Sequence, residues 1–99
     1  MPYLICYDIT SNKKRNQASR FLIQSGLVRI QKSVFIGSLS SSGLEGLKNR
    51  LQKLKQKNPG PEDKVHILKI HQQAATEMTM IGAQMDMRFV LASEKVIFL

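Results

Sequence analysis

The stretch Tyr3-Leu4-Ile5-Cys6-Tyr7-Asp8-Ile9 decides how the rest of the chain folds. It is short and rich in aromatic and β-branched residues, which is typical of a strand covered on both faces. The longest unbroken apolar run of the whole chain, Tyr3–Tyr7, is far shorter than the roughly 18 residues that a membrane-spanning helix needs. The chain is therefore expected to begin with a core strand and to have no membrane span.

A helix is predicted directly after this strand. Thr10-Ser11-Asn12 supplies residue types that cap helix N-termini. Gly26 is of the type that ends helices. We therefore expect a helix over about residues 12–25, with apolar positions at helical spacing at Ala18, Phe21 and Leu22.

Residues 28–36 alternate between two kinds of side chain, as residues of a strand do. Lys32 interrupts this alternation, and a kink or turn there would divide the segment into two strands. One face carries apolar side chains, at Val28, Ile30, Val34 and Ile36, and the other carries Arg29, Gln31, Ser33 and Phe35.

A second helix is predicted to start at Ser42. The residues Ser42-Gly43-Leu44-Glu45 match the capping-box pattern. The outer face of this helix is almost entirely Lys and Arg. Asn58-Pro59-Gly60-Pro61 ends it. The apolar stripe consists of Leu44, Leu47, Leu51 and Leu54.

The last third of the chain contains three further β-rich segments. Lys64–Ile70 is the longest, and a short strand is expected at about Glu77–Ile81, stopped by Gly82. Residues 83–93 have no assignable pattern. Val96–Leu99 is predicted as a C-terminal strand, and pairing with a second subunit is the simplest way to cover its apolar residues.

This order of elements predicts an α+β fold, a ferredoxin-like sandwich with an antiparallel sheet and two helices on one face. A chain of 99 residues is long enough for one hydrophobic core but not for two, so we expect a single domain, residues 1–99. We divide it into a core, residues 1–82, and a C-terminal dimer-pairing segment, residues 83–99. A core this small gains stability from oligomerisation, so we expect a homodimer.

Positive charge is concentrated in the first 57 residues. Fifteen Lys and Arg against seven Asp and Glu give a net charge of +8. Eleven of these cations lie in residues 1–57 with only two acids, Asp8 and Glu45, so that part carries +9 and the remainder −1. Such clustering predicts contacts with nucleic-acid phosphates, the alternative being a solvated basic face. The candidate nucleic-acid-binding residues are Lys13, Lys14, Arg15, Arg29, Phe35, Lys48, Arg50, Lys53, Lys55 and Lys57.

Several function classes are disfavoured. The single cysteine, Cys6, can form neither an intramolecular disulfide nor a zinc site by itself. The N-terminus does not match a signal peptide, so we expect a cytoplasmic protein in a reducing compartment. No Ser-His-Asp arrangement, Walker loop or Rossmann glycine pattern is present. His66 and His71 are five residues apart, hence on opposite faces of a strand, and are not predicted to form a metal pair.

Asp8 is the candidate catalytic carboxylate. It lies near the end of an apolar strand, just before a helix whose first turn holds Lys13, Lys14 and Arg15. The helix dipole disfavours cations at that place, and broken local rules are typical of functional sites. Helix N-termini also attract phosphate. A structural role in the turn is the alternative for Asp8.

A metal site at Asp8 depends on dimerisation. Magnesium usually takes one or two carboxylates plus substrate phosphate oxygens. Glu45, the other acid of the first 57 residues, lies on a different element. A two-fold dimer that brought Asp8 together with its symmetry mate would supply a pair of carboxylates for Mg²⁺ or Mn²⁺.

Two residues of the segment 28–36 are further candidates. Arg29 is suited to hold a phosphate or to neutralise charge during phosphoryl transfer. Phe35 either stacks on a base or packs against the sheet, and packing is the commoner fate of a strand phenylalanine.

Three pieces of the sequence together resemble a known family, the second of the two core CRISPR-associated adaptation proteins, which includes endonucleases. The tripeptide and the long Arg-x-Gln-x-Ser-Val-Phe block make the resemblance specific over about residues 2–37, and it extends loosely toward the C-terminus. The pieces are Tyr7-Asp8-Ile9, Lys14-Arg15-Asn16 and Gly26-Leu27-Val28-Arg29-Ile30-Gln31-Lys32-Ser33-Val34-Phe35-Ile36-Gly37.

The resemblance implies a ferredoxin-like homodimer whose C-terminal strand pairs with the other protomer. It also implies partnership with the CRISPR integrase subunit, with the dimer bridging integrase dimers along DNA. Some relatives cut RNA or DNA with a divalent metal through the aspartate that matches Asp8, and Arg15, Arg29 and Phe35 match further motif positions. Gln17 stands where a second basic residue often follows Arg15.

Three functions follow as hypotheses. In the first, two Asp8 carboxylates hold one magnesium ion and Arg15 or Arg29 stabilises the charge during phosphodiester hydrolysis. In the second, the protein is a non-catalytic DNA-bridging scaffold, its basic helices bind backbone phosphates and Asp8 is structural. The third and weaker hypothesis is a toxin-like ribonuclease on the same fold.

Overall fold

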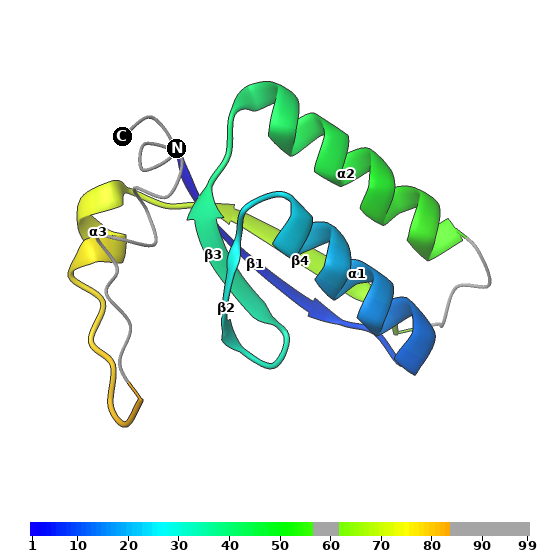
Figure 1. Ribbon diagram of the computed structural model, residues 1–99, viewed down its shortest axis with the longest axis horizontal. Helices are drawn as coiled ribbons and strands as arrows, with labels where there is room; N and C mark the ends of the chain where they lie inside the picture. Colours follow the sequence, from blue (N-terminus) through cyan, green and yellow to red (C-terminus); the bar gives the residue numbers. More distant parts are fainter. Residues whose placement is uncertain (57–61, 84–99) are drawn as a thin grey trace.

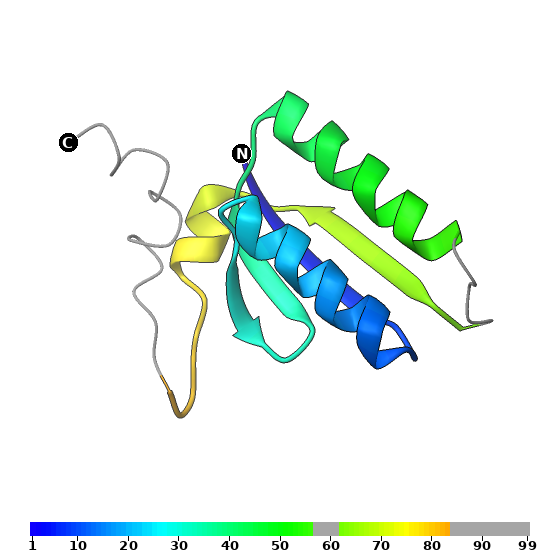
Figure 2. The same cartoon turned by 45° about the vertical axis from the view of Figure 1, so that its right-hand side comes forward.

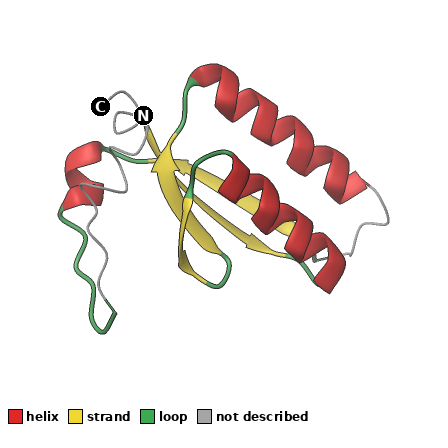
Figure 3. Cartoon of the chain, viewed as in Figure 1, coloured by secondary structure: helices red, strands yellow, loops and turns green. Residues whose placement is uncertain are grey.

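The computed structural model describes residues 1–56 and 62–83 (Figure 1). The four strands form one sheet in the order β2-β3-β1-β4, with every neighbouring pair antiparallel. Helices α1 and α2 cover the same face of this sheet (Figure 3), as predicted for a ferredoxin-like sandwich. The elements are β1 (Pro2–Asp8), α1 (Asn12–Gln24), β2 (Val28–Gln31), β3 (Val34–Ser38), α2 (Ser41–Gln56), β4 (Lys64–Lys69) and α3 (Gln72–Thr76).

The strand β1 lies in the middle of the sheet, between β3 and β4. Its side chains alternate between two unlike faces. Ile5 and Tyr7 belong to the core beneath the helices, whereas Cys6 is half-buried and Asp8 exposed on the opposite face. The expectation that β1 is covered on both faces is therefore met on the helix side and only in part on the other, where Leu4 packs in a second, smaller cluster.

The main core lies between the sheet and the two helices, which run side by side in both views (Figures 1 and 2). The predicted leucine stripe of α2 faces this core, with Leu47 and Leu51 buried and Leu44 and Leu54 half-buried. The largest side chains that are fully buried in it are Phe35, Ile5, Leu22 and Leu47.

Two cap predictions have different outcomes. Of the three predicted cap candidates, Thr10, Ser11 and Asn12, it is Ser11 that caps α1, since its hydroxyl accepts the Lys14 N–H at 3.3 Å. The prediction that Ser42 caps α2 is wrong. The Ser40 hydroxyl accepts the Gly43 N–H at 3.0 Å, so the helix starts at Ser41. The run of three serines offers alternative caps, and the one directly after the buried Leu39 is used.

The segment after Gly26 folds as two strands, β2 and β3, with a turn at Lys32 and Ser33, as predicted. The predicted faces are confirmed for Phe35 and Ile36, but not for Gln31, which a register shift after Arg29 sets opposite Val34. Phe35 belongs to the core under the helices, whereas Ile36 belongs to the smaller cluster on the opposite face.

The predicted strand at Glu77–Ile81 is wrong. Residues 72–76 form the short helix α3, and the residues after it pair with no strand in the described part of the chain. Burial nevertheless alternates along this segment, because Met78 and Met80 pack on the Ile36 cluster while Thr79 is exposed. An extended segment lying against a sheet face gives the same alternation as a paired strand.

Some predictions fall on residues outside the described ranges. They concern Lys57, the helix-ending Asn58–Pro61, the strand Val96–Leu99 and, beyond Ala83, the dimer-pairing segment 83–99. Within the described ranges, no helix combines the length and the apolar character that crossing a membrane requires.

Two glycines provide a test of this backbone. Gly26 has φ +90°, a conformation that strains an alanine, whereas Gly46 lies inside α2 with nothing within 4 Å of an added Cβ. Gly26→Ala should lower the free energy of unfolding by about 1 kcal/mol or more, and Gly46→Ala should raise it by about 0.5–1 kcal/mol. Urea denaturation measures both values, and equal effects of the same sign would contradict the assigned backbone.

Candidate functional site

Asp8 lies at the end of β1, on the sheet face turned away from α1 and α2. It is exposed and directly opposite Lys64 in the β1–β4 pair, and the neighbouring pair on the same face joins Cys6 and His66. Residues directly opposite in an antiparallel pair have Cβ atoms about 4.5–5.5 Å apart. These side chains line one open pocket with Tyr7. The site therefore combines a carboxylate, an ammonium group, a thiol and an imidazole.

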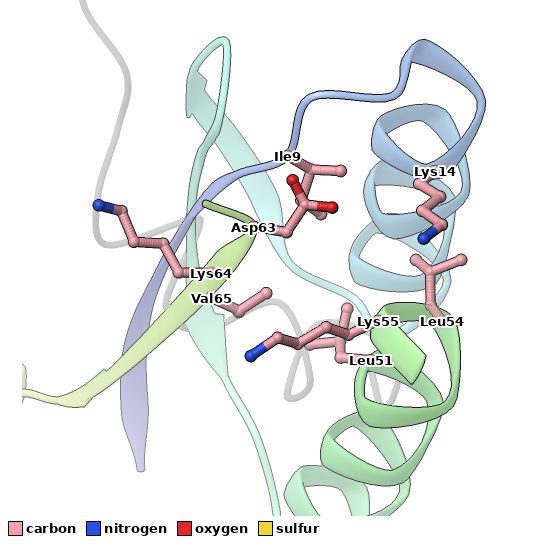
Figure 4. Close-up of a pocket in the computed structure, with 8 residues that line it drawn as sticks. All are labelled: Ile9, Lys14, Leu51, Leu54, Lys55, Asp63, Lys64 and Val65. Carbon is pink, nitrogen blue, oxygen red and sulfur yellow. The ribbon is translucent and has the colours of Figure 1, made fainter. Parts of the chain in front are cut away.

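The loop that follows Asp8 is fixed from two sides. The Asp63 carboxylate, from the residue just before β4, accepts the Thr10 N–H at 3.0 Å. On α1, Arg15 donates to the Ile9 carbonyl oxygen at 3.3 Å. Figure 4 shows Asp63 between Ile9 and the start of β4. These contacts hold the end of β1, and with it Asp8, in a defined place.

Asp63 is a residue that the sequence reasoning missed. Its side chain is 7% exposed, and its hydrogen bond joins positions 53 residues apart. The sequence shows that Asp63 directly precedes a predicted strand. It does not show which backbone N–H donates a hydrogen bond to the Asp63 carboxylate. A long-range hydrogen bond of this kind depends on the strand register, which local patterns do not give.

The donor set for a metal ion is incomplete in one protomer. The described ranges contain no group of three His, Cys, Asp or Glu residues placed to hold an ion. Asp8 is the carboxylate of the open pocket, and Glu45 is engaged with Lys48 on α2 at 3.5 Å. Mg²⁺ usually takes one or two carboxylates together with substrate phosphate oxygens, and two copies of Asp8 in a dimer would supply the larger number.

Arg29 and Phe35 form a structural unit on the other side of the sheet. Arg29 lies over the Phe35 ring, 5.1 Å from its centroid, and donates a hydrogen bond to the Ser19 hydroxyl on α1. The Phe35 ring is 0% exposed and stacks on Tyr7 with centroids 6.1 Å apart. The prediction that Phe35 contacts nucleic acid is therefore wrong, because its ring presents no surface to a base.

Within one protomer, the structure does not bring Arg29 to Asp8. Arg29 is opposite Phe35 and Phe35 opposite Ile5, so Arg29 is two strands away from β1, about 10 Å across the sheet. It also extends toward α1, whereas Asp8 is on the opposite face. Arg15 does lie at the same end of β1 as Asp8, half-buried against the loop.

Within residues 1–56, the remaining predicted phosphate contacts lie on the helix layer. On α2, Lys48 and Lys55 border a groove above β4 whose floor includes Val65 and Ile67. Arg50 extends toward α1 and lies 5.8 Å from the Phe21 ring centroid. Lys13 and Lys53 are exposed, and Lys14 lines a small pocket with Lys55 (Figure 4). The predicted cations are thus brought together around the two helices, on the face opposite Asp8.

Comparisons with known proteins agree with this architecture. The family described as "CRISPR associated protein Cas2" matches residues 1–78. The CRISPR-associated endoribonuclease Cas2 of Korarchaeum cryptofilum is 37% identical over 67 residues, which cover 68% of this chain and 69% of the relative. The CRISPR-associated endoribonuclease Cas2 2 of Pyrobaculum aerophilum is 33% identical over 82 residues, which cover 83% of this chain and 87% of the relative.

A solved structure shares the fold. The crystal structure of Streptococcus pyogenes Cas2 at pH 6.5 matches with a TM-score of 0.70 and 20% identity, covering 83% of this chain and 100% of that chain. At this identity the likeness concerns the fold alone, and it agrees with the sheet order and helix placement described above. The family match covers residues 1–78, which is most of the chain, and therefore shows the family as well as the fold. This chain belongs to the CRISPR-associated Cas2 family.

Proposed function

We propose that this chain acts in CRISPR spacer acquisition as an endonuclease that hydrolyses phosphodiester bonds at Asp8. The observation that carries the proposal is the exposed Asp8 carboxylate beside Lys64, held by the anchored β1–α1 loop. The relatives from K. cryptofilum and P. aerophilum are named endoribonucleases, which makes single-stranded RNA the first substrate to test and DNA the second.

The proposed reaction is a hydrolysis. Water adds to phosphorus, the bond to one bridging oxygen breaks, and the leaving oxygen takes a proton, so that atoms balance without any redox change. The Asp8 carboxylates of two protomers would hold Mg²⁺ or Mn²⁺, which supplies a Lewis acid for the phosphate and acidifies a bound water. Arg15, which donates to the Ile9 carbonyl oxygen at the same end of β1, would bind a phosphate that enters from the loop side.

The proposal includes three kinds of partner. A homodimer follows from the single carboxylate per protomer and from the small core. Nucleic acid follows from the charge of +8 and its gathering on the helix layer. The CRISPR integrase subunit follows from the family and from a role in spacer acquisition.

A second candidate function is a DNA-bridging scaffold without catalysis. The observation that favours it is the row of exposed cations on α2 and at the start of α1, which needs no metal and no second carboxylate to bind backbone phosphates. In this alternative, Asp8 only ends the strand. The two functions use opposite faces of the sheet, so one set of variants separates them.

Asp8→Asn tests the catalytic function. It removes the charge with almost no change of shape, so cleavage of single-stranded RNA with Mg²⁺ or Mn²⁺ should fall by at least about 100-fold, and EDTA should stop the wild type. Gel analysis of labelled RNA measures the rate, and sedimentation checks that the dimer is intact. Glu77→Gln, which alters an exposed acid elsewhere, is the control. Cleavage by Asp8→Asn at the wild-type rate would refute the assignment.

Reversing two cations of α2 tests the binding function. Lys53→Glu with Lys55→Glu should weaken duplex DNA binding and lower the salt slope of log K by about 2, since each lysine contributes about one phosphate contact. Fluorescence anisotropy at several salt concentrations measures the slope. The double variant Lys32→Glu with Lys69→Glu changes net charge equally outside both helices and is the control. Equal losses in the two double variants would mean that only total charge matters.

A further inference from the structure

We propose that Lys64 is a catalytic residue of the Asp8 site, where its ammonium group binds the scissile phosphate and stabilises the charge that develops on it. This inference rests on the proposed nuclease function and adds a residue that the sequence motifs did not single out. It adds a cation on the same sheet face as Asp8. Of the two residues expected to stabilise the charge, Arg15 lies at the loop after β1, and Arg29 lies on the other side of the sheet.

The register of β1 and β4 carries the argument. Asp8 and Lys64 are direct partners in an antiparallel pair, so their side chains leave the sheet on the same face and close to one another. Both are exposed, and both line the same open pocket. A phosphate placed at Asp8 on this face therefore lies within reach of the Lys64 ammonium group.

The residue before Lys64 is linked to the loop that follows Asp8. Lys64 directly follows Asp63, whose buried carboxylate accepts the Thr10 N–H of the β1–α1 loop. One hydrogen bond thus fixes the end of β1 relative to the start of β4. Asp8 lies two residues before Thr10, and Lys64 directly follows Asp63, so this hydrogen bond fixes the backbone beside both charged residues. Stabilisation of charge in a reaction requires such preorganised groups.

The other candidate cations of the described chain do not line the Asp8 pocket. The Arg29 guanidinium is bound to Ser19 and lies over Phe35. Arg15 donates to the Ile9 carbonyl oxygen, and Lys14 lines the pocket that contains Asp63 on the helix side. Lys64 is the cation among the residues that line the Asp8 pocket.

A lysine suits the proposed role. Its ammonium group is a compact charge on a flexible stem that follows the phosphate as it becomes more negative in the transition state. Lys64 forms and breaks no covalent bond, so the balance of the hydrolysis is unchanged. His66 and Cys6 also line the pocket, and no role in the reaction is assigned to them.

The test compares Lys64→Gln with Lys69→Gln. Both remove one exposed lysine from the same strand, but Lys69 pairs with Tyr3 at the far end of β4. With dimeric protein, Mg²⁺ and single-stranded RNA, Lys64→Gln should lower kcat/KM by roughly 10- to 100-fold, allowing for an open, solvated site. Lys69→Gln should stay within about twofold of the wild type, and Lys64→Arg should recover at least about a third of the lost rate because it restores the cation.

A binding measurement accompanies the rates. In the Asp8→Asn background, adding Lys64→Gln should weaken RNA binding by about three- to tenfold, since one phosphate contact is lost, and adding Lys69→Gln should not. Thermal melting of each variant checks that the fold is intact. A merely structural cross-strand pair would lower the melting temperature and leave kcat/KM unchanged.

The outcomes distinguish failure of the Lys64 role from failure of the nuclease function. If Asp8→Asn abolishes cleavage while Lys64→Gln changes neither kcat/KM nor RNA binding, the role of Lys64 is refuted and the nuclease function stands. If Lys64→Gln and Lys69→Gln lose equal activity, the effect is one of total charge and the role is again refuted. If the wild type cuts no RNA or DNA, the nuclease function fails and this role fails with it.

Discussion

β1 and β4 pair in a register that sets Asp8 opposite Lys64 and Cys6 opposite His66, and the rest of the site depends on this pairing. The hydrogen bond from the Thr10 N–H to the Asp63 carboxylate reinforces it at the end where Asp8 lies. A slip of one residue in β4 would move Lys64 to the helix side and bring Val65 opposite Asp8. Because the buried side chains of β1 face the helices, such a slip is opposed by the whole core.

The sheet separates two kinds of chemistry. On the helix side, apolar residues of β1 and β3 pack under α1 and α2, whose outer surfaces carry the exposed lysines. On the opposite side, the charged end of the sheet holds Asp8 and Lys64, and the other end is covered by α3 and Met78. A nucleic acid that contacts the helices therefore meets a different surface from one that reaches Asp8. Under the proposed function, this arrangement would allow binding and cleavage to be altered independently.

Much of the fold follows from patterns local in the sequence. The apolar run at residues 3–9, the helical spacing after Ser11 and the alternation around Lys32 predict β1, α1, β2 and β3 because each depends only on neighbours along the chain. The sequence predicts Ser42 as the cap of α2, whereas Ser40 caps it in the structure. Three successive serines are equivalent by type, so the sequence does not distinguish between them. The strand expected at Glu77–Ile81 shows that alternating burial does not distinguish a paired strand from a segment lying on a sheet.

The site was predictable only where a residue's place on its own element decides its role. Asp8 was identified from its position at the end of an apolar strand. The roles of Arg29 and Phe35 depend on contacts with α1 and β1, which the motif alone does not contain. Asp63 and Lys64 gain their importance from the pairing of β4 with β1, a contact between residues more than fifty positions apart. Side chains whose function comes from strand register were therefore missed.

The most direct test of the account is to locate bound RNA on the protein. Backbone amide and side-chain NMR signals of the Asp8→Asn protein, titrated with a short single-stranded RNA, report which face the substrate occupies. If RNA is cut at Asp8, the largest shifts should occur at the end of β1 and the start of β4, around residues 8 and 64–66. Shifts confined to α1 and α2, with none at those positions, would contradict the account and would favour the scaffold function.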